Sequence, residues 1–247
     1  MSAPIITVRG LSIGFGNEAL LERLDFDVAR GDVFAILGGS GTGKSTLMRH
    51  LVGLDRPMAG EVLVDGERPT LEGRPRVGLL FQSGALFGSL DLLENVALPL
   101  RQWTRLSKSA VERVAAAKLR LVGLEGFEHH LPAEISGGMK KRAGIARALA
   151  LDPPLLYLDE PSAGLDPVTS AHMDDLILSL NQNLGVTIVV VTHELESIAR
   201  VAKHCILLHR DRRGIIASGD PRALASQSSD VRVREFFRSA QSKVVAR

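Results

Sequence analysis

The chain has 247 residues, of which 45% are hydrophobic and 23% charged, as is ordinary for a globular protein with one large domain or two small ones. The formal net charge of +2 offers no electrostatic case for binding nucleic acid, and we expect no nucleic-acid partner. The single cysteine, Cys205, excludes an internal disulfide and fits a reducing cytosol.

Short runs rich in Val, Ile and Leu recur along the chain and predict strands. An antiparallel edge is expected first, at residues 5–9, 24–28 and 61–64. Continuous apolar runs, typical of parallel strands covered on both faces, follow at 33–37, 77–81, 155–158 and 187–191. Helical patterns lie between them, for instance at 44–53, 108–121 and 168–184. This alternation predicts an α/β fold.

Two segments depart from the alternation. Residues 83–152 show helical patterns without a convincing strand, which predicts an α-helical subdomain inserted into the core of a domain spanning 1–225. Residues 226–247 carry five basic and two acidic side chains and predict a C-terminal extension. Within it Val233, Phe236 and Phe237 recur at helical spacing and would form one apolar face. We expect this face to dock on a second copy of the chain or on an accessory subunit; docking on the chain's own core and a disordered, solvated tail are the alternatives.

A phosphate-binding pattern occupies the stretch LGGSGTGKST, residues 37–46, which we call the phosphate loop. It matches G-x-x-x-x-G-K-[ST], follows a predicted strand and opens a predicted helix. Its glycines let backbone N–H groups turn inward around phosphate oxygens. Lys44 supplies charge to the β- and γ-phosphates, and the Ser45 hydroxyl can ligate Mg²⁺. The predicted nucleotide-binding residues are Gly38, Gly39, Ser40, Gly41, Thr42, Gly43, Lys44, Ser45 and Thr46.

Polar groups follow three further apolar strands. Asp159 and Glu160 end the run LLYLDE, where Asp159 is placed to reach Mg²⁺ and Glu160 to orient or deprotonate a water aimed at the γ-phosphate. Gln82 follows VGLLF and His193 follows TIVVVT. A polar residue after a single strand is usually just solvated. Because the carboxyl ends of parallel strands share one edge, however, the four groups are expected to converge there on one nucleotide.

A second anion site is indicated by EISGGMKKRAG, residues 134–144. It reads as a helix capped by Ser136 and opened by Gly137 and Gly138, with three cations crowding the first turn at 140–142. Cations there oppose the helix dipole unless an anion is present, which raises the question of what a second phosphate cradle serves.

The order of these motifs resembles that of ATP-binding subunits of ABC transporters. Walker A lies at 38–45, a Q-loop glutamine at 82, a signature loop at 135–139, Walker B and a D-loop at 155–166, and a switch histidine at 193. The resemblance implies a P-loop NTPase (RecA-like) fold, an ATPase using ATP and Mg²⁺, and two copies packed head to tail. It implies catalytic roles for Lys44, Gln82, Glu160 and His193, metal binding by Ser45, Gln82 and Asp159, and contacts from Ser136, Gly137 and Gly138 to the partner's ATP.

Two departures from the family pattern stand out. The signature loop has Ile135 and Met139 where LSGGQ is commonest, but its Ser-Gly-Gly core is intact. Phe15 lies where the family usually has a tyrosine that stacks on adenine, and its ring keeps the face needed for stacking. A core-packing role for Phe15 is the alternative.

One branch of the family is especially similar. SGGM, the stretch LLFQSGALFGSLDLLENVALPLR and the C-terminal extension resemble ATPases of Mce-type lipid transporters, including the system that maintains lipid asymmetry. The resemblance implies a permease, Mce-type lipid-binding and accessory subunits, and a cytoplasmic location, peripheral on the inner face of the inner membrane. An apolar groove for a short permease helix is expected around the Q-loop, formed by Leu86, Phe87, Leu90 and Leu93.

Other readings remain. The chain could serve an ABC transporter of another hydrophobic cargo, or be a soluble ABC ATPase without a transport role. A DNA-repair ATPase would need a long coiled coil, a translation factor two Walker A motifs, and a small-molecule kinase an acceptor pocket and lid. A non-catalytic scaffold is disfavoured because Lys44, Glu160 and His193 are present. No signal peptide or apolar span of ~20 residues is apparent, and the sequence does not identify cargo, direction of transport or permease.

Overall fold

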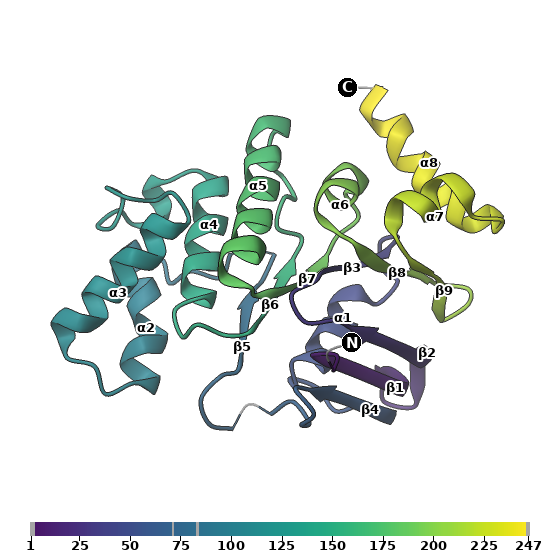
Figure 1. Cartoon of the computed structure of the whole chain (residues 1–247), viewed down its shortest axis with the longest axis horizontal. Helices are drawn as coiled ribbons and strands as arrows, with labels where there is room; N and C mark the ends of the chain where they lie inside the picture. Colours follow the sequence, from purple (N-terminus) through teal and green to yellow (C-terminus); the bar gives the residue numbers. More distant parts are fainter. Residues whose placement is uncertain (1–2, 71, 83, 246–247) are drawn as a thin grey trace.

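A six-stranded sheet runs through the middle of the molecule (Figure 1). The computed structural model describes residues 3–70, 72–82 and 84–245, with side chains up to residue 238. The strand order is β5-β6-β7-β3-β8-β9, and every neighbouring pair is parallel except β8 with β9. The strands are β3 (Val33–Gly38), β5 (Val77–Leu80), β6 (Leu155–Asp159), β7 (Thr187–Val191), β8 (His204–His209) and β9 (Gly214–Gly219).

The continuous apolar runs arise because both faces of this sheet are buried. In β3, Ala35 and Leu37 pack into one hydrophobic cluster, whereas Phe34 and Ile36 pack into a second cluster on the opposite face. Successive side chains of a strand point to opposite faces, so a strand between two cores must be apolar at every position. The four predicted core strands are confirmed within a residue or two.

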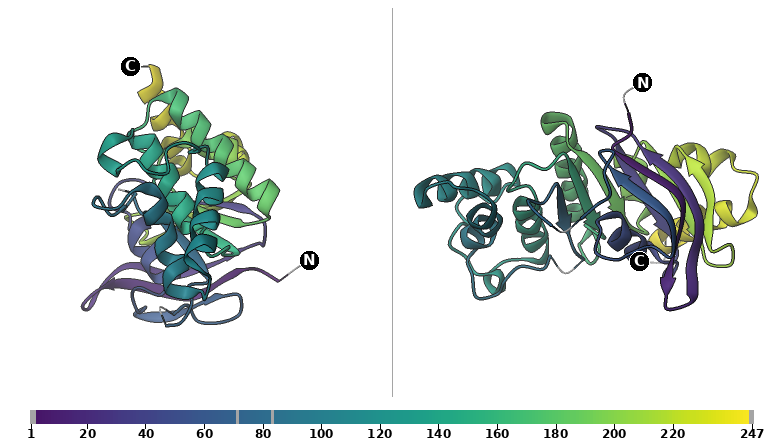
Figure 2. Two further views of the ribbon diagram at one scale, coloured as in Figure 1. Left: turned by 90° about the vertical axis from the view of Figure 1, so that its left-hand side faces the viewer. Right: turned by 90° about the horizontal axis from the view of Figure 1, so that it is seen from below.

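An antiparallel sheet and one helix cover one face of the main sheet (Figures 1 and 2). The sheet has the order β2-β1-β4, and the predicted edge strands are therefore confirmed, although all three are longer than expected. The helix begins directly after the phosphate loop. The elements are β1 (Ile6–Phe15), β2 (Glu18–Val28), β4 (Ala59–Val64) and α1 (Lys44–Leu51).

Helices cover the other face, and those of the connection between β5 and β6 extend beyond the β5 edge (Figure 1). The chain between β5 and β6 contains helices and, in its described residues, no strand. The predicted fold class, α/β with an antiparallel edge and an inserted helical subdomain, is confirmed. The helices are α2 (Leu92–Trp103), α3 (Lys108–Leu121), η1 (Pro132–Glu134), α4 (Gly137–Ala148), α5 (Pro167–Leu184), α6 (Leu195–Val201) and α7 (Pro221–Gln227).

Strands β8 and β9 are not indicated by the sequence patterns above. β8 is nevertheless central, because it pairs with β3 from Phe34↔His204 to Gly38↔Leu208. Its buried residues have the same apolar character as the other core strands. In the described part of the chain, no helix has both the length and the hydropathy to cross a bilayer.

The C-terminal extension forms α8 (Val231–Val245), which packs on α7 (Figure 1). Val233 is fully buried and Phe237 is 8% exposed, and both belong to the same cluster as the main-sheet core. The expectation that this apolar face docks on a second copy or an accessory subunit is therefore wrong for these two residues. Burying a Phe is worth roughly 1.5–3 kcal/mol, enough for the chain's own core to order the start of the helix.

Candidate functional site

The phosphate loop connects the end of β3 to the start of α1 and requires glycine at several positions. Gly41 and Gly43 have φ values of 74° and 90°, in the left-handed region. A Cβ on Gly43 would lie 2.9 Å from Leu20 Cδ2, and one on Gly38 would lie 2.6 Å from Thr42 Oγ1. The loop backbone therefore runs too close to its neighbours to accept a side chain at Gly38 or Gly43 without a shift, and glycine lets its N–H groups turn toward a phosphate.

Lys44 is the first residue of α1, near the end of this loop, and is buried. Its Nζ donates hydrogen bonds to the carbonyl oxygens of Gly38, at 2.9 Å, and Gly39, at 3.0 Å. Burial lowers the pKa of the Lys44 ammonium, while the carboxylates of Glu160 and Asp159 act in the opposite direction. The ammonium is thus held inside the cradle by neutral acceptors, which a phosphate oxygen can replace.

Asp159 is the last residue of β6 and faces the loop. Its side chain is hydrogen-bonded to Ser45, yet its Oδ1 is buried without a partner among the described residues. Burial raises the pKa of Asp159, which the Ser45 hydrogen bond opposes. A buried carboxylate oxygen without a partner is costly, and a hydroxyl beside it adds a second hard ligand. These two side chains fit Mg²⁺ held together with phosphates.

In the described part of the chain, no group of three or more His, Cys, Asp or Glu side chains is arranged to hold a metal on its own. This agrees with the chemistry of Mg²⁺, which protein sites bind through one or two side chains plus substrate phosphates and water.

Glu160 is anchored at both its side chain and its backbone. Its carboxylate accepts a hydrogen bond from Thr192 Oγ1 at 2.9 Å and lies 2.8 Å from His193 Nδ1. Its backbone N–H donates to the carbonyl of Val191 at 2.8 Å. Its φ of 49° is left-handed, a conformation that costs a non-glycine residue about 1–3 kcal/mol. Strain of this kind at a polar site persists only where surrounding contacts hold it.

Gln82 lies two residues beyond β5, and its side chain is exposed. Because Leu80 pairs with Leu158 in the parallel register, Gln82 is level with Glu160 along the strands. Among the described residues, no hydrogen bond joins Gln82 to the carboxylates. The structure thus brings Lys44, Asp159, Glu160 and His193 together, and places Gln82 at the same sheet edge without a direct contact.

The signature loop lies elsewhere. Ser136 is the N-cap of α4, and its Oγ accepts a hydrogen bond from Met139 N at 3.2 Å. Ser136 and Gly137 are exposed. The buried residues of α4 belong to the core on the helix-covered face of the main sheet, whereas those of α1 belong to the opposite core (Figure 1). Ser136 therefore does not join the phosphate loop of its own chain.

The cations of the signature helix need a correction. Lys141 does not supply charge to an exposed anion site, because its side chain is buried and its Nζ donates to the carbonyl oxygens of Glu160 and Ala163. Thr192 was also missed as a functional candidate. Thr192 could have been found from the sequence, because it is a polar residue directly after the apolar run of β7. The residues around Lys141 give no indication that its side chain points inward.

Phe15 ends β1 and is 70% exposed, so the core-packing alternative is wrong for this side chain. An exposed aromatic ring at the end of a strand is available to stack on a planar ligand. Its distance in sequence from the phosphate loop is bridged by the fold, because β2 follows β1 and Leu20 of β2 lies against Gly43.

Together, the parallel sheet, the glycine-lined loop opening α1 and the carboxylates at the end of β6 define a P-loop ATPase. Residues 21–163, more than half of the chain, match the ABC transporter family. The chain belongs to this family, and the predicted fold and ATPase activity are confirmed.

Two groups of relatives are similar along almost the whole chain. The "Probable ribonucleotide transport ATP-binding protein mkl" of Mycobacterium leprae is 42% identical over 239 residues, which are 94% of this chain and 68% of that protein. The "Intermembrane phospholipid transport system ATP-binding protein MlaF" of Escherichia coli strain K12 is 41% identical over 242 residues, covering 95% and 89%. The chain thus spans about two thirds of the mycobacterial protein and most of the other.

Two solved structures of ATP-binding cassettes are similar to this chain. A dimeric ATP-binding cassette in a post-hydrolysis state, bound to ADP and Pi, matches with a TM-score of 0.76 and 31% identity, covering 87% of this chain and 98% of that one. The cassette cbiO1 from Clostridium perfringens, part of the ABC transporter complex cbiONQ, matches with a TM-score of 0.83 and 25% identity over the full length of both chains. The family's cassettes thus include dimers, and one is seen with the products of ATP hydrolysis.

Proposed function

We propose that two copies of this chain pack head to tail around two Mg-ATP and drive a permease that moves phospholipid or a related lipid across a bacterial envelope. The chain would lie on the cytoplasmic face of the inner membrane, with Mce-type lipid-binding and accessory subunits in the same complex. The observation that carries the proposal is the 41% identity to the phospholipid-transport ATPase over 95% of this chain.

Within each site, the chain's residues divide the work between holding phosphate and handling the attacking water. Lys44 exchanges its two carbonyl acceptors for β- and γ-phosphate oxygens. Ser45, Asp159 and Gln82 hold Mg²⁺, which when bound neutralises charge on those phosphates. The phosphate loop from Gly38 to Thr46 encloses them with backbone N–H groups.

Glu160 orients the attacking water and accepts its proton. Thr192 and His193 each contact one of its two oxygens, so the carboxylate is fixed in direction before the nucleotide arrives. This geometry supports a general base whose carboxylate is already oriented for the attacking water. His193 is exposed enough, at 58% of its side chain, to reach the γ-phosphate as well.

Ser136, Gly137 and Gly138 serve the nucleotide held by the partner copy. Two observations support this assignment: Ser136 and Gly137 are exposed, and α4 packs into the core on the opposite face of the sheet from α1. A helix N-terminus offers unpaired N–H groups and a positive dipole, both suited to a γ-phosphate.

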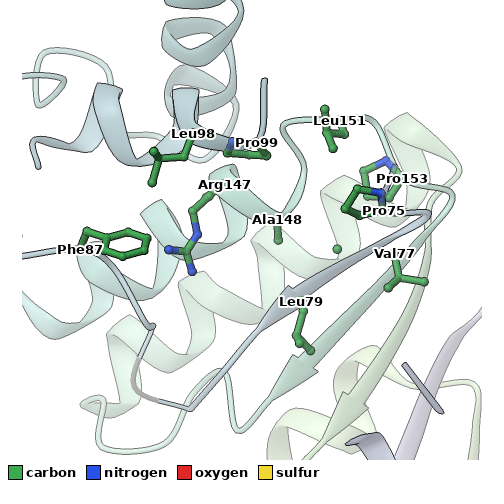
Figure 3. A pocket seen from close by; sticks show the side chains of 11 residues that line it. Pro75, Val77, Leu79, Phe87, Leu98, Pro99, Arg147, Ala148, Leu151 and Pro153 are labelled. Atoms are coloured by element: carbon green, nitrogen blue, oxygen red, sulfur yellow. The ribbon is translucent and has the colours of Figure 1, made fainter. Parts of the chain in front are cut away.

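An apolar groove supports the permease part of the proposal (Figure 3). Phe87, which is 57% exposed, and Arg147 both line it. The remaining lining residues come from β5 and its approach, from α2, and from the end of α4 and the following loop: Pro75, Val77, Gly78, Leu79, Leu98, Pro99, Ala148, Leu151 and Pro153. The groove has a volume of about 300 Å³ and suits a short amphipathic helix from a membrane subunit.

Of the four residues expected to form this groove, only Phe87 lines it. Leu86 and Leu93 pack against the core, and Leu90 is half-buried. Phe87 is presented outward because the fully buried Asn95 binds both its backbone N–H, at 2.8 Å, and its carbonyl, at 3.1 Å.

The test is recovery of the tagged full-length chain from detergent-solubilised membranes, followed by identification of its partners and bound lipid. A permease and phospholipid should co-purify with the wild-type chain. Phe87→Asp should lose the permease, whereas Leu184→Asp, a matched change at an apolar side chain 47% exposed at the end of α5, should retain it. Recovery of the chain without any membrane protein would contradict the transporter proposal.

A second cargo class comes from the mycobacterial relative, whose name specifies ribonucleotide transport. If the purified complex contains a permease but no lipid, and its ATPase rate rises with ribonucleotides instead of phospholipid vesicles, this candidate replaces the first.

A further inference from the structure

Lys141 is a buried cation whose contacts are not explained by nucleotide binding within one chain. It lies in the first half of α4 and is 8% exposed. Its Nζ donates to the carbonyl oxygen of Glu160 at 2.8 Å and to that of Ala163 at 2.7 Å. Both acceptors belong to the turn that follows β6. A side chain from the inserted helices therefore binds the backbone of the turn that begins with Glu160.

The turn from Glu160 to Ala163 is closed by few other contacts. Ala163 N donates to the Glu160 carbonyl at 3.2 Å, and that oxygen therefore accepts both this bond and the one from Lys141. The left-handed backbone of Glu160 is held at this point, since its carbonyl direction follows from its φ and ψ. Thr192 and His193 contact the carboxylate only. Lys141 is the side chain that anchors the other end of the same residue.

The burial of Lys141 is compensated by these acceptors and by nearby charge. Burial lowers the pKa of its ammonium, while the carboxylates of Glu194 and Glu160 act in the opposite direction. A buried cation is retained only where hydrogen bonds and opposite charge replace its hydration. The two carbonyls and the two acidic neighbours provide both.

The helix that carries Lys141 is also the helix that Ser136 caps. Its first turn packs tightly on the chain after β6, because a Cβ on Gly138 would lie 2.7 Å from Thr169 Cγ2 and 3.7 Å from Leu165 Cδ2. A displacement of the exposed N-terminus of α4 would therefore move Lys141 and the turn together.

We propose that Lys141 is a positioning residue that holds Glu160 in its working geometry, and that it makes this geometry depend on the seating of α4 against the partner's nucleotide. The second part rests on the proposed head-to-tail arrangement. The Glu160 carboxylate of each chain then takes its working position only when the signature loop of the same chain has bound the nucleotide held by the partner. This dependence links the two hydrolysis events.

The experiment compares ATP hydrolysis and ATP binding by the full-length wild-type chain and by Lys141→Met, which keeps the side-chain volume and removes the donors. We expect kcat to fall by about 30-fold, within the range typical of a misplaced catalytic group, with KM and ATP affinity changed less than about twofold. Lys141→Arg, which keeps donors, should recover most of kcat. Lys118→Met is the matched control, because Lys118 is a lysine of the same helical subdomain whose side chain is only 13% exposed and pairs with Asp152 away from the site; it should stay within about threefold of wild type.

A combined variant separates positioning from a merely structural role. If Lys141 acts through Glu160, Lys141→Met should not lower the residual rate of Glu160→Gln further, because the carboxylate it positions is already absent. A kcat for Lys141→Met within threefold of wild type, an equal loss for Lys118→Met, or additive losses in the double variant would each overturn the inference. A wild-type rate for Glu160→Gln alone would instead overturn the proposed role of Glu160.

Discussion

The phosphate loop and the signature helix look alike in sequence but are organised differently in the fold. Each opens a helix with small residues and carries a buried lysine whose ammonium donates to two backbone carbonyls. The acceptors of Lys44 belong to its own loop, whereas those of Lys141 belong to the turn after β6. Lys44 therefore binds carbonyls of the loop that surrounds it, whereas Lys141 binds carbonyls of a segment distant in the sequence.

This difference decides what each loop can do alone. The phosphate loop has a concave backbone, a cation at its centre and two carboxylates beside it. The signature helix directs one lysine away from its exposed tip, where Ser136 Oγ already accepts from Met139. What remains there is a hydroxyl and the N–H groups of the first turn, which suit a phosphate presented from outside.

The largest expected effect comes from Glu160, whose carboxylate lies near Lys44 and whose carbonyl accepts a hydrogen bond from Lys141. Glu160→Gln should lower turnover by about 10³-fold, because an amide cannot accept the proton of the attacking water. ATP binding should persist, since amide and carboxylate are nearly isosteric, and the trapped nucleotide should hold two copies together. Single-turnover hydrolysis and size-exclusion chromatography measure both. A near wild-type single-turnover rate would contradict the assignment.

The next largest effect is expected from a change in the signature loop. Ser136→Arg should reduce hydrolysis by about 10²-fold, as removal of one well-placed donor to developing charge does. ATP affinity of the monomeric chain should change less than about threefold, because the phosphate loop lies on the other side of the sheet. Loss of ATP binding by the monomer would show that this loop contacts its own chain's nucleotide.

Two neighbouring glycines sharpen the distinction between partner contact and internal packing. A Cβ on Gly137 has no atom within 4 Å, so Gly137→Ala should leave stability unchanged or raise it by about 0.5–1 kcal/mol. Its hydrolysis rate should still fall, by about tenfold, because the methyl lies where the phosphate approaches. Gly138→Ala meets Thr169 at 2.7 Å and should destabilise the fold by about 1–2 kcal/mol. Thermal unfolding and ATPase assays compare them, and a reversed order of stabilities would refute this packing.

The smallest expected effect concerns binding of the adenine ring of ATP, not binding of its phosphates. Phe15→Ala should weaken ATP binding by about fivefold, which corresponds to about 1 kcal/mol of stacking, with little change in stability because the ring is 70% exposed. Phe15→Tyr should bind as the wild type does. Equal affinity of Phe15→Ala for ATP, measured by calorimetry, would show that the ring does not contact adenine.

The sequence alone was enough to identify the α/β fold, the phosphate loop and the residues at the strand ends. These signals are local: an apolar run, then a turn with glycine or a carboxylate, describes the strand and its polar end within a few residues. Parallel pairing then requires the ends to meet at one edge. Lys44, Asp159, Glu160 and His193 converge for this reason.

Tertiary structure alone decided the remainder, because it depends on partners distant in the chain. β8 lies beside β3, where the Leu208 carbonyl would be 3.0 Å from a Cβ on Gly38, and the phosphate loop alone cannot reveal this neighbour. α8 buries Val233 and Phe237 in the chain's own core, although its apolar face would fit other surfaces equally well. Lys141 turns inward because the carbonyls of residues 160 and 163 offer acceptors there. A charged residue reads as solvated until the fold supplies the groups that replace water.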